Sequence, residues 1–413
     1  MTKLQNGKNT RRSALRLAVL LAATALCGCA SLSKIENNED VSRGLSYQAQ
    51  YRSDGVGKSA SSQSSLAINA QKCTTGSGAS VVSTSSYSGP VDTQLLSQGD
   101  LVTLLVEEDE LLSGRYEIMQ DGTLKIPHVA PVRASGRTVE QVERELAATL
   151  KSNGYYRSVP RVSIRLQDIA DARVNVSGAV FEPGAVSVGG QSSQDRDLLR
   201  QEASGAGARD RRLSRALQVA GGVRPDADLA RIKLNRGGAT TIIDVRPALD
   251  GRPFNDVILL SGDVVEVPSR NCFQEELVKP SSITMQGVRV FMSNLADSAS
   301  NNAGAAIGKE TQDLRYGPRV LQAIAGMNCL GGSKLTNANR TAALISRNPV
   351  TGESIVVERS VERLMRQADR DDFNPYIMPG DAMACYDSTY TTVTDVLETL
   401  PTVLGPVATL SLL

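Results

Sequence analysis

The sequence predicts an α+β fold built from several small domains rather than from one large sheet. Short alternating strand segments recur between residues 95 and 387, and short amphipathic helices interrupt them. A Gly-Asp step stands beside a predicted strand three times, at Gly99-Asp100, Gly262-Asp263 and Gly380-Asp381. One order of elements (strand, short helix, Gly-Gly, strands) occurs twice. These observations predict a first α+β domain followed by two copies of one module.

The N-terminus has the features of a bacterial lipoprotein signal peptide. Five basic residues precede an apolar run, residues 17–26, which is too short to span a bilayer. Gly28-Cys29 follows, and a small residue before cysteine suits the lipoprotein signal peptidase. We expect residues 1–28 to be removed and Cys29 to carry lipid, with an ordinary signal peptide as the alternative. Ala30 stands where an Asp would favour the inner membrane, which indicates the outer membrane.

Residues 29–91 are predicted to form a tether. They are rich in Ser, Gly, Asn, Gln and Thr and offer little apolar surface to bury. Fully extended, a tether of this length reaches roughly 200 Å. Folded sequence is expected to begin near Leu95.

The first domain is predicted over residues 92–170. Residues 101–106 read as a strand, and Asp121-Gly122 breaks an alternating stretch as a hairpin turn does. Residues 138–146 read as an amphipathic helix, with Thr138 as its N-cap and Gln141 at the capping-box position. Residues 160–166 alternate as a strand.

The two modules are predicted over residues 171–270 and 281–387. In the first, a strand leads into the turn Glu182-Pro183-Gly184, and Gly221-Gly222 ends a short helix that begins at Leu213. The second copy is more diverged, because its Gly287 is followed by apolar residues without the Pro-Gly turn.

The three Gly-Asp steps are interpreted as structural turns. Glycine allows a positive φ, and the aspartate side chain bonds to its own backbone as the chain enters the next strand. Each aspartate stands without a neighbouring carboxylate or histidine in the sequence, so a catalytic or metal-binding role is not favoured.

Composition and charge limit the function classes. Removal of residues 1–28 takes away five basic residues and changes the net charge from +1 to −4, which argues against a nucleic-acid partner. The chain has no Trp and few aromatic residues, which disfavours a sugar-stacking cleft. The single histidine, His128, has no accompanying nucleophile motif. We expect no enzyme activity, no metal and no cofactor.

The cysteines do not fix their own pairing. If Cys29 is lipidated, Cys73, Cys272, Cys329 and Cys385 remain, and four cysteines allow three pairings. A disulfide between Cys329 and Cys385 is favoured because both fall in the second module.

The C-terminal residues 390–413 are predicted to form an amphipathic helix of about 35 Å, close to the roughly 30 Å of a membrane core. A ring of such helices would turn an apolar face to lipid and a polar face to a water-filled pore. Packing of the stripe on the second module, or on the membrane surface, remains an alternative, and Pro401 or Pro406 leaves a kink open. The predicted lipid-facing residues are Val393, Val396, Leu397, Leu400, Val403, Leu404 and Val407, and the pore-facing residues are Asp395, Glu398 and Thr402.

The sequence resembles the polysaccharide export (Wza-type) outer-membrane lipoproteins. Gly99-Asp100, residues 121–127 and residues 136–140 are similar to the family's export domain. Residues 176–184 and 220–223 are similar to a soluble-ligand-binding β-grasp module, of which residues 281–387 would be a second copy.

The resemblance implies a ring homo-oligomer, an octamer, whose C-terminal helices form an α-helical barrel in the outer membrane. It implies a large periplasmic portion and an inner-membrane co-polymerase with tyrosine-kinase function as partner. Tyr155 and Tyr156 lie where the family has a loop near the periplasmic entrance, so they are candidates for a constriction.

The expected function is therefore a passive, hydrated channel that exports capsular or extracellular polysaccharide. A β-grasp lipoprotein that binds a ligand or scaffolds another envelope machine is the alternative. A periplasmic hydrolase is a third class, which the lack of paired catalytic residues disfavours.

Overall fold

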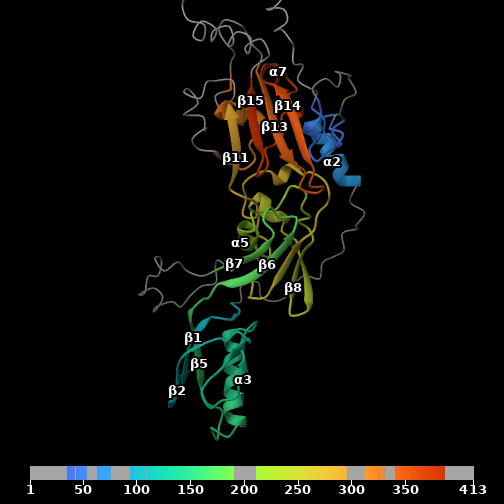
Figure 1. Ribbon diagram of the computed structural model, residues 1–413. Helices are drawn as coiled ribbons and strands as arrows, with labels where there is room; N and C mark the ends of the chain where they lie inside the picture. The colour runs from blue at the N-terminus through green and yellow to red at the C-terminus, as the bar shows by residue number, and fades with distance from the viewer. Residues whose placement is uncertain are drawn as a thin grey trace, which may run out of the picture. The chain divides into compact units, whose positions relative to one another are not determined.

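The computed structural model describes residues 35–41, 43–53, 63–75, 94–107, 109–189, 211–294, 312–327, 329–330 and 340–386 (Figure 1). The elements below belong to the compact unit Asn38–Leu413. The predicted signal peptide, Cys29 and the C-terminal helix at 390–413 lie outside the described residues. The architecture is mixed α+β, with several small sheets and few helices, as predicted from the sequence.

The first domain is an antiparallel sheet covered by one long helix. Its strand order is β2-β1-β5, and a two-stranded ribbon of β3 and β4 accompanies it. The helix α3 packs on β5, and its buried residues face the sheet. The bounds are β1 (Leu101–Val106), β2 (Asp109–Glu117), β3 (Thr123–Leu124), β4 (Val132–Arg133), α3 (Val139–Ser152) and β5 (Val162–Asp168).

The start of α3 is set by the predicted capping box. The Thr138 hydroxyl accepts a hydrogen bond from the Gln141 amide, and the Gln141 side chain accepts one from the Thr138 amide. Both satisfy amides that the first helical turn leaves open. Val142, Leu146 and Leu150 then recur on one face and are buried in the core of the domain.

The first module is a five-stranded sheet with the order β7-β6-β10-β8-β9. Its first and last strands, β6 and β10, are parallel neighbours, and the other pairs are antiparallel. The helix α5 is buried on its inner side and ends before Gly221 and Gly222, both with positive φ. The bounds are β6 (Ala172–Gly178), β7 (Gly184–Val188), α5 (Leu213–Val219), β8 (Ile232–Arg236), β9 (Ala239–Ile243), η2 (Arg246–Asp250) and β10 (Val264–Val267).

The second module repeats this topology. Its order is β12-β11-β15-β13-β14, and its first and last strands are again parallel neighbours. The internal repeat seen in the sequence is therefore present as a repeat of strand order. The bounds are β11 (Gly287–Asn294), β12 (Gln312–Arg315), α6 (Val320–Gly326), β13 (Thr341–Arg347), β14 (Ser354–Ser360), α7 (Val361–Arg366), η5 (Arg370–Phe373) and β15 (Ala382–Tyr386), and η3 (Glu275–Leu277) precedes this module.

The two parallel strand pairs give a residue-by-residue correspondence between the modules. Val267 pairs with Gly178 in the first module, and Cys385 pairs with Asn294 in the second. Asn294 therefore occupies the position of Gly178. Gly287 opens its strand, whereas Gly178 closes one.

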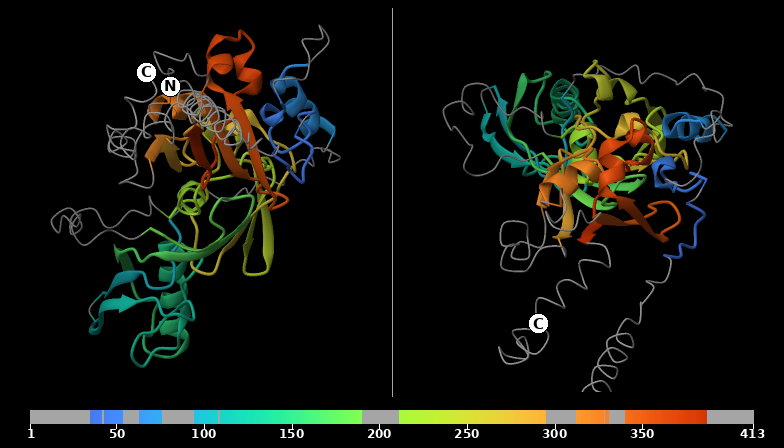
Figure 2. Two further views of the ribbon diagram at one scale, coloured as in Figure 1. Left: turned by 45° about the horizontal axis from the view of Figure 1, so that its top comes forward. Right: turned by 90° about the horizontal axis from the view of Figure 1, so that it is seen from above.

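The segment predicted to be a tether is folded in part. Residues 43–53, called the N-terminal strap from here on, and helix α2 (Ser65–Thr75) lie beside the second module (Figures 1 and 2). Tyr47 and Tyr51 of the strap belong to the core of that module, and a short 3-10 helix, η1 (Ala49–Tyr51), shapes it. The prediction of a tether with little to bury was wrong for these residues, because two tyrosines outweigh the polar composition around them.

Gly178 provides a test of the parallel strand pair. Its φ is +89°, and a Cβ there would stand 2.0 Å from the Val267 carbonyl oxygen. We predict that Gly178→Ala lowers the free energy of unfolding by at least ~2 kcal/mol, because alanine disfavours this positive φ and its Cβ would overlap the Val267 carbonyl oxygen. Calorimetric unfolding measures this change.

The matched control is Gly184→Ala, where nothing lies within 4 Å of the added Cβ. This variant should change stability by less than about 1 kcal/mol. Equal effects of the two substitutions would contradict the close approach of the strands.

Candidate functional site

Four of the predicted site residues lie in the described part of the chain: Tyr155, Tyr156, Cys329 and Cys385. The lipidation site Cys29 and the predicted lipid-facing and pore-facing residues of the C-terminal helix lie outside it. Within the described ranges, every helix is too short or too polar to cross a membrane. The same ranges contain no group of three His, Cys, Asp or Glu side chains arranged to hold a metal ion.

The tyrosine pair follows α3, and its two members differ. Tyr155 is 46% exposed, and its hydroxyl donates to the His128 carbonyl. Tyr156 packs against the core of the first domain, and its hydroxyl donates to the Asp109 carboxylate. Partial burial, together with this hydrogen bond, raises the pKa of Tyr156 to about 12. Tyr155 is thus the more accessible ring, and the constriction role of the pair stays a prediction.

The three Gly-Asp steps form the same turn. Gly99, Gly262 and Gly380 have φ of +84°, +92° and +83°. In each turn a carboxylate oxygen of the aspartate accepts a hydrogen bond of 2.8 Å from the amide three residues earlier, and all three aspartates are buried. The predicted turn geometry is confirmed. Because these carboxylates are out of water, what surrounds each one matters more than the turn itself.

The first aspartate joins the first domain to the first module. Arg211 is fully buried and donates to both carboxylate oxygens of Asp100, at 2.9 and 3.3 Å. The same guanidinium donates to the Leu95 carbonyl at 3.0 Å. Burial raises the pKa of Asp100, and the charge of Arg211 opposes that rise. Since Asp100 directly precedes β1 and Arg211 precedes α5, this ion pair links the two domains.

A second contact at this junction brings two of the turns together. The Ser261 amide, beside Asp263, donates to the Ser97 hydroxyl, beside Asp100, at 3.2 Å. Ile258, which comes just before the second turn, is buried in the core of the first domain. The junction therefore combines an ion pair, a hydrogen bond between turns and apolar packing.

The second and third aspartates have different partners at corresponding positions. Arg236 at the end of β8 donates to both oxygens of Asp263, at 2.9 and 2.6 Å. In the second module, Asp381 has a hydrogen bond with Ser346 instead of an ion pair with an arginine. Burial raises the pKa of Asp381 to about 7.

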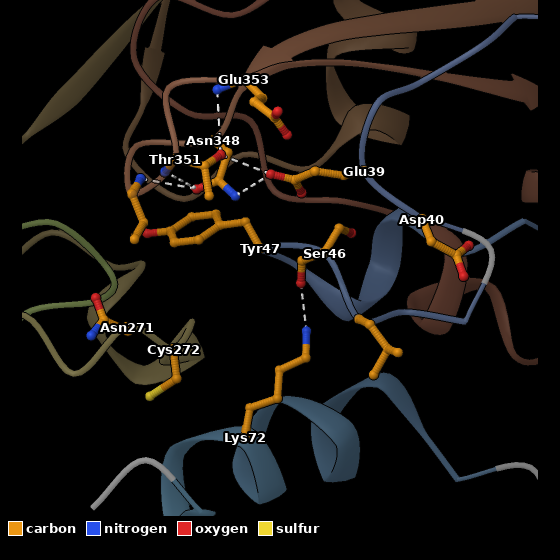
Figure 3. A pocket seen from close by; sticks show the side chains of 12 residues that line it. Glu39, Asp40, Ser46, Tyr47, Lys72, Asn271, Cys272, Asn348, Thr351 and Glu353 are labelled. Atoms are coloured by element: carbon orange, nitrogen blue, oxygen red, sulfur yellow. Dashed lines mark hydrogen bonds between the residues drawn. The ribbon is translucent and has the colours of Figure 1, made fainter.

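A pocket of 360 Å³ lies between the strap, α2 and the second module (Figure 3). At one side, the Glu39 carboxylate accepts hydrogen bonds from Asn348 at 2.7 Å and Thr351 at 2.8 Å. At the other, the Lys72 ammonium donates to the Ser46 carbonyl, and burial lowers the pKa of Lys72 to about 8. These hydrogen bonds lie at the edges of the pocket. Those of Glu39 hold the N-terminal residues to the second module, and that of Lys72 holds α2 to the strap.

Two disulfides are present among the described residues. Cys329 and Cys385 are joined inside the second module, which is the pairing favoured from the sequence. Cys73 of α2 is joined to Cys272, with 5.2 Å between their Cα atoms. This second bridge closes 199 residues of chain and attaches the N-terminal segment covalently to the region between the two modules.

Fold and junction together define a multidomain protein: a small α+β domain, bonded through a buried ion pair to the first of two modules with one topology. Residues 89–167 match the family model of polysaccharide biosynthesis/export proteins. This match covers the first domain and confirms, for that domain, the resemblance seen in the sequence. No curated protein matches the chain at a significant level.

Several residues that organise the structure were not singled out from the sequence. They are polar or charged side chains bonded to partners 27 positions away, for Arg236, or more than 100 positions away, for Arg211, Tyr51 and Arg359. The spacing of residues within a helix or strand does not reveal such pairs. The one available signal was that Tyr47 and Tyr51 stand four residues apart within an otherwise Ser-rich segment.

Arg211→Met tests the junction. The substitution leaves the Asp100 carboxylate buried without its counter-charge, so we predict a loss of about 3–5 kcal/mol in unfolding free energy. The double variant Arg211→Met with Asp100→Asn should recover part of this, because the neutral amide still accepts from Ser97. Chemical unfolding of both variants measures the difference.

The control for the junction is Arg252→Met, which removes an exposed ion pair with Asp250. It should change stability by no more than about 0.5 kcal/mol. If Arg211→Met were equally mild, the buried ion pair would not be what links the domains.

Because Asp381 is buried, we predict that the free energy of unfolding depends on pH, and that Asp381→Asn removes this dependence. The pKa of this carboxyl is about 7 in the folded protein against 3.8 ordinarily. Between these values the unfolded chain has released the proton while the folded chain keeps it, so stability falls as pH rises from about 4 to 7. Asp381→Asn carries no such proton, so its stability relative to wild type should increase between pH 5 and pH 8.

Calorimetry of both proteins at the two pH values measures this relative shift. The control Asp263→Asn breaks the ion pair with Arg236 and should destabilise the first module at both pH values. Parallel pH curves for wild type and Asp381→Asn would show that the buried carboxyl does not titrate in this range.

Proposed function

We propose that this protein is the outer-membrane channel of a polysaccharide export system. The observation that carries the proposal is the match of residues 89–167 to polysaccharide biosynthesis/export proteins. The two following modules of one topology, in the order implied by the resemblance, support it. The protein supplies a hydrated passage, and transport is driven from the inner-membrane partner. No enzymatic step is proposed for it.

The N-terminal sequence supports an anchor close to the second module. Glu39 already bonds to Asn348 and Thr351 of that module. Cys29 is ten positions before Glu39 in the sequence, so the chain between them can extend at most about 35 Å. We propose that the second module is on the membrane side and that the export domain faces the periplasm, where an inner-membrane co-polymerase with tyrosine-kinase function would contact it.

The C-terminal residues 390–413 complete the proposed channel. In a ring of copies, an octamer by the resemblance, the Val and Leu stripe from Val393 to Val407 faces lipid. Asp395, Glu398 and Thr402 face the pore, where water keeps the two carboxylates solvated. A single copy lacks such a pore, so the channel depends on the oligomer.

A truncation after Tyr390 tests the channel. We expect surface polysaccharide to fall to background, while the calorimetric unfolding of the described domains stays as in the full chain. Native mass measurement in mild detergent should show a defined large oligomer for the full chain.

The matched control is Cys29→Ser, which removes the predicted lipid and keeps the helix. It should lose membrane retention while its described domains unfold as before. Normal polysaccharide export by the truncated chain, or a strict monomer of the full chain, would favour a scaffolding lipoprotein instead.

A further inference from the structure

The strand registers show that the second module lacks an arginine that the first module uses. In the first module, Asn235 pairs with Val264, and Arg236 comes next. In the second, Ile345 pairs with Ala382, and Ser346 comes next. Ser346 therefore stands at the position of Arg236. The aspartate is retained, as Asp381, but its arginine is missing.

The strap takes up this position from outside the module. The hydroxyl of Tyr51 donates to the Ser346 hydroxyl at 3.0 Å, and Ser346 in turn bonds to Asp381. Tyr51 is 2% exposed and belongs to the core of the module. The Tyr51 ring of the strap thus lies where the first module uses its own Arg236 side chain.

A second departure between the modules also serves the strap. Ile232 pairs with Ile243 in the first module, and Ala342 pairs with Arg359 in the second, so Arg359 occupies the position of Ile243. Both side chains are buried. Arg359 donates to the Gln50 and Arg52 carbonyls of the strap at 2.8 and 2.9 Å. The Phe373 and Glu358 carbonyls of the module accept two more hydrogen bonds from this guanidinium, so strap and module together satisfy the buried arginine.

Further hydrogen bonds fix the register of the strap. The Gln48 side chain donates to the Tyr376 carbonyl and accepts from the Tyr376 amide, both at 2.9 Å. The Ala49 amide donates to Asn69 of α2 at 3.0 Å. The Cys73–Cys272 disulfide then holds α2 in place. Strap, helix and bridge form one continuous attachment.

We propose that the N-terminal strap is a structural part of the second module, and that oxidation of Cys73 and Cys272 locks it there. The module is then complete only in an oxidising compartment. In the locking step, each thiol loses one proton and one electron, and the sulfur–sulfur bond forms. A disulfide of a thiol-oxidising protein accepts the two electrons and the two protons and becomes a dithiol.

The first test introduces the arginine of the first module into the second module. Tyr51→Ala removes the ring and should increase amide hydrogen exchange of residues 46–52 by roughly 100-fold. Ser346→Arg, with Tyr51 in place, crowds the same space and should release the strap as well. The double variant Tyr51→Ala with Ser346→Arg gives Asp381 the arginine that the first module has.

For the double variant we expect the midpoint of thermal unfolding of the second module to exceed that of either single variant. Losses that simply add in the double variant would overturn the proposal. Tyr51→Phe, which keeps the ring and removes only the hydroxyl, is the conservative control and should raise exchange far less than Tyr51→Ala. Exchange in residues 46–52 equal to wild type for Tyr51→Ala would also overturn it.

The second test addresses the bridge. Cys73→Ser with Cys272→Ser should raise exchange of residues 46–52 by roughly tenfold or more, since the covalent closure of a long loop is lost. The control Cys329→Ser with Cys385→Ser removes a bridge inside the module and leaves α2 attached. It should therefore not raise the hydrogen exchange of residues 46–52 relative to that of the module. An unchanged strap in the first variant would refute the lock. These readouts do not depend on export, so they stand apart from the proposed function.

Discussion

The structure depends on how a buried carboxylate is accommodated at each Gly-Asp turn. The turn itself leaves one carboxylate oxygen bonded to the backbone and requires a further partner in a place without water. Asp100 obtains Arg211 from the next domain, Asp263 obtains Arg236 from its own sheet, and Asp381 obtains Ser346 with Tyr51 behind it. Two of these three solutions reach outside the domain that holds the aspartate. The turns therefore act as joints between parts of the chain as well as entries to strands.

In the proposed channel, these joints would hold neighbouring domains to one another. A channel needs its domains to keep a fixed order and orientation under the passage of a polymer. The Asp100–Arg211 pair with its surrounding contacts holds the first two domains, and the Cys73–Cys272 bridge holds the N-terminal segment to the second module. In the proposed function, the anchored end of the chain is thereby attached to a folded module, whereas a loose tether would leave the distance to the membrane undefined.

Much of the fold could be predicted because its signals are local. The Thr138 capping box, the strand at 101–106, the Gly-Gly end of α5 and the repeated order of the two modules all follow from residues within a few positions of one another. The strap could not be predicted in this way. Its partners Ser346 and Arg359 are about 300 positions away, and their roles appear only when the strand registers of the two modules are compared. The correspondence of Gly178 with Asn294 likewise appears only from the strand registers, because glycine and asparagine share no sequence pattern there.

The most direct measurement is electron cryo-microscopy of the full, lipid-modified chain in detergent at a resolution that shows side chains. The account predicts a ring of copies in which Tyr51 of each copy lies against Ser346 of the same copy, with Cys73 and Cys272 joined. A single copy without neighbours would contradict the channel. A ring with Tyr51 turned to solvent, and Ser346 facing Asp381 alone, would contradict the central claim that the strap completes the second module.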